Sequence, residues 1–94
     1  MKKIFISQPV QGLSEEEIKR ERKEIVRAIA EEYGEDTKIL GNYYLIDDLN
    51  LLVSELKDLA NATAAFFARG WQESKRCKIE HDIAEAYGLE IVCD

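Results

Sequence analysis

The sequence predicts an α/β protein built on a four-stranded parallel sheet. Four short apolar runs alternate with three longer segments in which apolar residues recur at helical spacing. Strands that alternate with helices favour a parallel sheet with right-handed crossovers. The expected strand order is 2-1-3-4, so the first and third strands would be neighbours where the order reverses. We expect the 94 residues to form one domain around one core.

The first strand is expected over residues 2–7, which are apolar and β-prone. Pro9, the only proline, indicates a fixed turn after this strand. Ser14 and Glu17 have the spacing of a capping box, so a helix should begin there, and Gly34 should end it. Its predicted buried face consists of apolar residues at helical spacing: Ile18, Ile25, Val26, Ile29 and Tyr33.

The middle of the chain predicts a second strand and a second helix. The strand covers residues 37–40, and either Asp47 or Asp48 can cap the helix that follows. The buried face of this helix is again predicted from apolar residues at helical spacing: Leu49, Leu52, Val53, Leu56, Leu59 and Ala60.

The last third of the chain predicts two strands with a helix between them. The strands cover residues 63–68 and 89–93, and the helix should begin at residue 74 or 75 and end before Gly88. Its predicted buried stripe consists of four residues at helical spacing: Ile79, Ile83, Ala86 and Tyr87.

Composition excludes several classes of function. A net charge of −6 argues against binding to polymeric nucleic acid, although one local basic pair could still hold a nucleoside or nucleotide. No apolar run approaches the ~20 residues of a membrane span, and the amino terminus has no signal-peptide core, so we expect a cytosolic protein without membrane contact. The two cysteines, Cys77 and Cys93, are expected to be free thiols.

The densest chemistry lies in residues 70–84, immediately after the third strand. In an open α/β sheet, ligands bind where loops leave the carboxyl ends of strands, beside the point where the strand order reverses. The loop over residues 7–12 leaves the neighbouring first strand and should face this segment across one crevice. We therefore expect the ligand site between these two stretches.

Glu80 is the carboxylate that this geometry favours for chemistry. A partly desolvated glutamate that faces a crevice can act as a nucleophile at a sugar carbon. The alternative from position alone is a surface glutamate paired with Lys75 or Arg76. Cys77 and His81 are four residues apart and could touch, but too few ligands are present for zinc, so we expect no metal and no cofactor.

Basic and aromatic residues at the same helix start suggest further contacts. Lys75, Arg76 and Lys78 lie where helix amides already favour anions. These residues could bind a phosphate group, or they could form a solvated basic surface without a ligand. Trp71 could stack on a base or pack in a core or interface.

Several segments together resemble the nucleoside 2-deoxyribosyltransferase-like family, above all its short phage and bacterial members. The resemblance spans almost the whole chain. The segments that carry it are Phe5-Ile6-Ser7-Gln8-Pro9, Phe66-Phe67-Ala68-Arg69-Gly70-Trp71, Ser74, Cys77, Ile79-Glu80-His81, Ala84 and Tyr87-Gly88.

That resemblance implies a flavodoxin-like sandwich and cleavage of the N-glycosidic bond of a nucleoside or nucleotide. The family's glutamate nucleophile falls on Glu80, and Arg76 would hold a 5′-phosphate if the substrate has one. Proton donation to the leaving base is left to His81 or Asp82. The residues expected to line the substrate site are Ser7, Gln8, Pro9, Gly12, Gly70, Trp71, Ser74, Arg76, Cys77 and His81.

Two other functions stay open from the sequence. One is a nucleotide-binding module of the same fold without catalysis. The other is a small protein-interaction domain that uses Trp71 and the adjacent Tyr43 and Tyr44. A homodimer is also expected, since a domain of this size gains stability by association.

Overall fold

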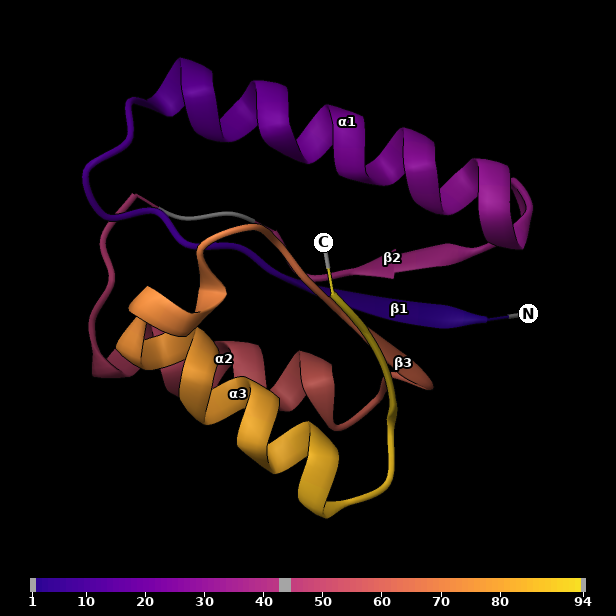
Figure 1. The fold of residues 1–94 in the computed structure, drawn as a ribbon. Coiled ribbons are helices and arrows are strands. Elements are labelled where there is room, and N and C mark those ends of the chain that lie inside the picture. The colour runs from indigo at the N-terminus through magenta and orange to yellow at the C-terminus, as the bar shows by residue number, and fades with distance from the viewer. Residues whose placement is uncertain (1, 43–44, 94) are drawn as a thin grey trace.

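A computed structural model, which describes residues 2–42 and 45–93, has the predicted α/β architecture (Figure 1). Residues 43–44, which we expected to contribute to an interaction surface, lie outside the described part. Strands and helices alternate along the chain as predicted. In order, the elements are β1 (Lys3–Ser7), α1 (Glu15–Tyr33), β2 (Lys38–Leu40), α2 (Leu49–Leu59), β3 (Ala64–Phe67), the short 3₁₀ helix η1 (Trp71–Glu73), α3 (Lys75–Ala86) and β4 (Glu90–Cys93).

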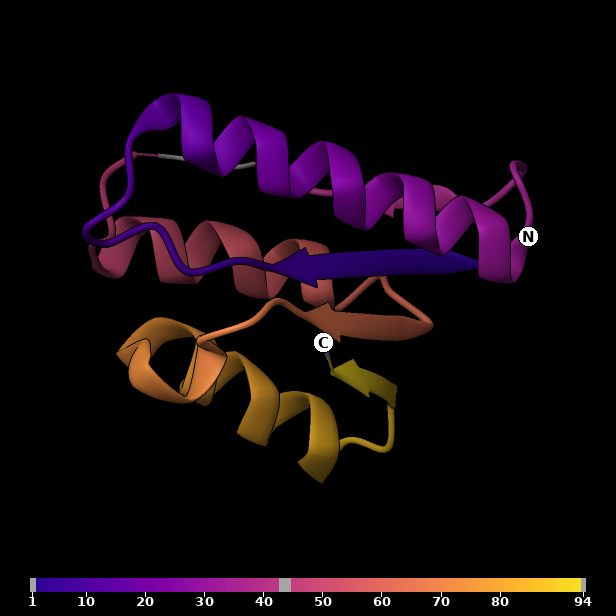
Figure 2. The same ribbon diagram turned by 45° about the horizontal axis from the view of Figure 1, so that its top comes forward.

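The four strands form one parallel sheet in the predicted order β2-β1-β3-β4. Helix α1 covers one face of the sheet, and α2 and α3 cover the other, which gives a three-layer sandwich of flavodoxin-like arrangement (Figures 1 and 2). Strands β1 and β3 are neighbours, with Ile6 paired to Phe66 and Ser7 to Phe67. The loops that follow these two strands therefore leave the sheet side by side.

The pleat of β1 divides its side chains between two cores. Alternate residues of a strand face opposite sides of the sheet. Ile4 and Ile6 pack with Ile25 and Ile29 under α1, whereas Phe5 packs in the second core with residues of α2 and α3. Ser7 has the same parity as Phe5, so its hydroxyl faces the α2–α3 layer.

The helix starts are capped as the sequence indicates. Ser14 and Glu17 form both hydrogen bonds of the capping box, and Asp48, rather than Asp47, caps α2 by accepting from the amide of Leu51. Ser74 caps α3 through its hydroxyl. Among the helices formed by residues 2–42 and 45–93, none is long and apolar enough to cross a membrane.

The predicted buried faces of α1 and α2 need correction. On α1, Ile18, Ile25 and Ile29 are buried as expected, but Val26 is 37% exposed. On α2 the stripe is rotated: Leu49 is 73% exposed, and Val53 is also exposed. The residues that α2 buries follow an i, i+4 row, and one of them is charged: Leu51, Glu55 and Leu59.

The predicted stripe of α3 is correct only at Ile83, which packs half-buried against the second core. Ile79 is 38% exposed, and Tyr87, which lies just beyond the last helical residue, is 83% exposed. The apolar residues of this helix are scattered around its circumference, so their spacing selects no face strongly. The residues that α3 buries are instead two polar ones and two small ones: Arg76, Cys77, Glu80 and Ala84.

Candidate active site

The carboxylate of Glu80 is fully buried at the carboxyl end of β1. The hydroxyl of Ser7, the last residue of β1, donates a hydrogen bond of 2.6 Å to Glu80 Oε1. This short contact follows from the pleat, which directs Ser7 toward α3. Glu80 is therefore neither a solvated surface glutamate nor a partly desolvated one that faces a crevice, because its side chain is fully buried and does not line the neighbouring hollow.

Arg76 connects four segments around this carboxylate. Its Nη1 lies 3.3 and 3.5 Å from the two oxygens of Glu80, one helical turn away, and also contacts Glu55 of α2. Its Nε donates to Asp47 at 3.2 Å, and its Nη2 donates to the backbone carbonyl of Gln8 at 2.7 Å. The side chain of Arg76 is only 4% exposed. Arg76 therefore belongs to a buried network and does not form the surface ion pair with Glu80 that was one of the two hypotheses from the sequence.

Glu55 is the residue that sequence reasoning missed. It lies between Leu51 and Leu59 in the i, i+4 row that α2 turns toward the interior. The row Arg76–Glu80–Ala84 occupies the buried face of α3, so the two rows bring Glu55 and Glu80 onto the same cation. The sequence did contain a signal for this burial, because Glu55 lies four residues from Leu51 and four from Leu59 and so shares their face of the helix.

The two buried carboxyls share one cation, and this controls their protonation. Burial raises the pKa of Glu55 to about 9, with repulsion from Glu80 adding to the shift. Burial also raises the pKa of Glu80, and the hydrogen bond from Ser7 and the charge of Arg76 oppose this rise without cancelling it. Because Ser7 donates to Glu80, we assign the proton that the two carboxyls share to Glu55.

A hollow of about 470 Å³ lies next to this network. It is bounded by the loop after β1, the start of α2, and the start of α3. Arg76 lines the hollow and contacts Glu80, whereas Glu80 itself does not reach the hollow wall. The residues that line it include Gln11, Asp47, Leu52, Lys75, Arg76 and Ile79.

Cys77 and Ser74 lie beside Glu80 but have structural contacts. Cys77 is fully buried, and burial raises the pKa of its thiol, with hydrogen bonds from Ser7 and Ser74 opposing the shift. A buried thiol with a raised pKa is a poor nucleophile. Within residues 2–42 and 45–93, no group of three or more His, Cys, Asp or Glu side chains could hold a metal ion.

The loop after β1 contributes mainly its backbone. The side chain of Gln8 turns toward α1, where its amide donates to the carbonyl of Ile18 and to Glu21, both at 2.9 Å. Its buried Oε1 has no hydrogen-bond partner among the described residues. Pro9 is half-buried, and Gly12 lies exposed in the next turn with a φ of 79°.

Trp71 and His81 form a separate aromatic group. Their rings stack with centroids 4.2 Å apart, and both also contact the ring of Phe67. His81 Nδ1 lies 3.4 Å from the carboxylate of Asp82. Gly70 has a φ of 88° at the start of η1, a left-handed conformation that suits glycine. The rings of Trp71 and His81 therefore pack against each other and against β3.

Of the predicted site residues, the structure brings together Ser7, the carbonyl of Gln8, Arg76, Cys77 and Glu80. Comparison with known proteins adds no constraint: no family model, no curated protein and no solved structure matches the chain.

Proposed function

We propose that this protein cleaves the N-glycosidic bond of a nucleoside or nucleotide, as a transferase or a hydrolase, with Glu80 as the nucleophile. The observation that carries the proposal is a fully buried glutamate, held by Ser7 and Arg76 beside a second buried carboxyl group, that of Glu55. The resemblance to the nucleoside 2-deoxyribosyltransferase-like family supports the same reaction. We infer a cytosolic protein that uses no metal.

The two carboxyl groups suit a two-step displacement. An oxygen of Glu80 bonds to the anomeric carbon, the C1′–N bond breaks, and its electron pair stays on the base nitrogen as Glu55 donates its proton there. Water or a second base then attacks C1′, and the Glu80–C1′ bond breaks to restore the carboxylate. The proton of that acceptor returns to Glu55. Such division of roles needs two carboxyls with different pKa values.

Arg76 controls access in this proposal. The guanidinium separates Glu80 from the hollow of about 470 Å³, so the sugar reaches the carboxylate only when Arg76 moves away from it. A substrate phosphate is the anion that would draw Arg76 from Glu80, consistent with the 5′-phosphate role expected from sequence. Ser7 would lie beside the bound sugar because its hydroxyl holds Glu80, whereas the side chain of Gln8 turns toward α1 on the other face of the sheet.

The test is release of free base from a panel of deoxynucleosides and deoxynucleotides, followed by chromatography. Glu80→Gln keeps the size of the side chain but removes the nucleophile, so turnover should fall at least about 10³-fold. Glu85→Gln, an exposed change on the same helix, should leave turnover unchanged. Absence of base release by the unaltered protein, or release that survives Glu80→Gln, would reject the proposal.

The full burial of Glu80 favours one rival, a nucleotide-binding module without catalysis. In this alternative the network fixes α3 against α2, and a nucleotide occupies only the hollow. Titration calorimetry with the same panel separates the two functions. Binding without base release supports the binding module, whereas binding accompanied by release supports the enzyme.

We also propose a homodimer that covers the start of α2. Exposed apolar side chains form a patch at the start of α2, beside the hollow. Leu49→Lys at its centre should shift sedimentation toward monomer, whereas Tyr87→Lys, at an exposed site beyond α3, should not. Equal sedimentation of the two variants would remove this surface. The patch consists of Leu45, Ile46, Leu49, Val53 and Ile79.

A further inference from the structure

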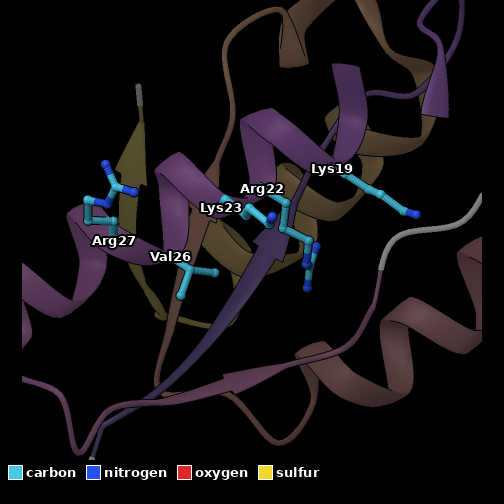
Figure 3. Close-up of a pocket in the computed structure, with 5 residues that line it drawn as sticks. All are labelled: Lys19, Arg22, Lys23, Val26 and Arg27. Carbon is cyan, nitrogen blue, oxygen red and sulfur yellow. The ribbon is translucent and has the colours of Figure 1, made fainter. Parts of the chain in front are cut away.

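A second hollow, of about 600 Å³, lies along α1 on the far side of the sheet from Glu80 (Figure 3). Its lining residues recur at i, i+3 or i+4 and so form one stripe along the helix. Val26 is the apolar member, and the other four are cations in a protein of net charge −6. The five residues are Lys19, Arg22, Lys23, Val26 and Arg27.

This basic groove adjoins an edge of the sheet. Arg22 and Val26 point from α1 on the side of β2 in Figure 3, and Arg22 Nη2 donates to the carbonyl of Gly41, just after β2, at 3.0 Å. In the sheet of the described residues, β2 is an edge strand. The amide of Lys38 donates to Lys2 next to β1, so by alternation the N–H and C=O of Ile39 point outward.

The groove therefore offers three kinds of contact together. Charged heads can meet carboxylates, Val26 and the aliphatic stems of the cations can meet an apolar side chain, and the edge of β2 can pair with an extended backbone. We propose that the groove between α1 and β2 binds an extended acidic polypeptide segment in which acidic and apolar residues alternate.

Charge around the groove argues against two other occupants. A nucleic acid carries negative charge along its whole length and would run past Glu15–Glu17 at one end of α1 and Glu31 and Glu32 at the other. A second α1 packed antiparallel across a two-fold axis would set one basic stripe against the other. A short segment with its own charge confined to the groove avoids both penalties.

The experiment uses fluorescence anisotropy with a labelled peptide in which glutamate alternates with valine. We expect saturable binding with a Kd below about 1 mM, weakened at least about tenfold in the double variant Lys23→Glu, Arg27→Glu. The matched control is Arg20→Glu, which makes the same kind of charge reversal on α1 outside the groove lining. This control should change the Kd by less than about twofold.

Nuclear magnetic resonance tests the role of the edge strand. The backbone amide of Ile39 should shift on titration with the same peptide, and a peptide with lysine in place of glutamate should cause no shift. Absence of saturable binding, an equal loss in Arg20→Glu, or no shift at Ile39 would overturn the proposal. Tighter binding of oligothymidylate than of the peptide would overturn it in favour of nucleic acid. None of these outcomes depends on base release at Glu80.

Discussion

Helices α1 and α3 cover opposite faces of the same sheet and bury opposite kinds of surface. Under α1 the contacts are aliphatic, with Ile25 and Ile29 against Ile4 and Ile6. Under α3 the buried row contains Arg76 and Glu80 and reaches Glu55 across to α2. The spacing of apolar residues predicted most of the buried face of α1 but not the buried face of α3.

The buried charges under α3 are not what stability alone would favour at a buried helix face. An aliphatic face gains free energy from burial, whereas buried charges cost desolvation that their mutual attraction only partly offsets. Replacing a buried ion network with apolar side chains is often neutral or stabilising. The buried network at the carboxyl end of β1 therefore supports the proposed chemistry, because folding alone does not require it.

The largest stability effect should come from removing the shared cation. Arg76→Met leaves Glu55, Glu80 and Asp47 without their guanidinium, so the free energy of unfolding should fall by about 4 kcal/mol. Arg20→Met on the exposed side of α1 is the matched control and should cost less than about 0.5 kcal/mol. Urea unfolding measures both. A loss below about 1 kcal/mol at Arg76 would show that the network carries little energy.

Two isoleucine variants test whether the buried faces of α1 and α3 are those of the structure or those that apolar spacing predicts. Ile25 is buried under α1, so Ile25→Ala should lower the free energy of unfolding by about 3 kcal/mol. Ile79 was predicted to be buried but is 38% exposed, so Ile79→Ala should cost less than about 1 kcal/mol. The same urea titration measures both variants. Comparable losses in the free energy of unfolding would mean that Ile79 is buried, as the apolar spacing on α3 predicts.

The most specific effect is the pH dependence of stability, and within any one pH unit it is the smallest of the three. The pKa of Glu55 rises from an ordinary 4.5 to about 9 on folding, so the folded protein holds a proton that the unfolded chain releases. The contribution of Glu55 to stability should therefore be complete at low pH and decline between about pH 4.5 and 9, by at most about 1.4 kcal/mol per pH unit.

Glu55→Gln provides the comparison, because an amide carries no titrating proton in either state. Its stability profile should be flatter than that of the unaltered protein across this window, while Glu85→Gln should keep the original slope. A Glu55→Gln profile parallel to the original would mean that Glu55 is ionised in the folded protein.

The fold was predictable because its elements carry local signals. Ser14 with Glu17 marks one helix start, Gly34 marks an end, and the four apolar runs alternate with helical segments. The strand order follows from that alternation with right-handed crossovers. The face of α3 was not predictable from periodicity, because its buried positions are polar or small and its exposed ones include Ile79.

The site was predictable only in part. Glu80 was located by its place after β3, and its proximity to the loop after β1 followed from the strand order. Glu55 was missed because it comes from α2, and only packing of α2 against α3 brings it to Arg76. The unexpected burial of Arg76 has the same cause, since three carboxyl groups from different parts of the chain surround it.

Trapping the covalent intermediate tests the central claim most directly. Deoxynucleosides and deoxynucleotides with fluorine at C2′ slow the second step, because fluorine destabilises its oxocarbenium-like transition state. After incubation and proteolysis, mass spectrometry should find the fluorinated sugar attached to the peptide that contains Glu80, and no adduct in Glu80→Gln. Release of base from the ordinary substrates without any adduct at Glu80, or with the sugar attached to Glu55, would contradict the account.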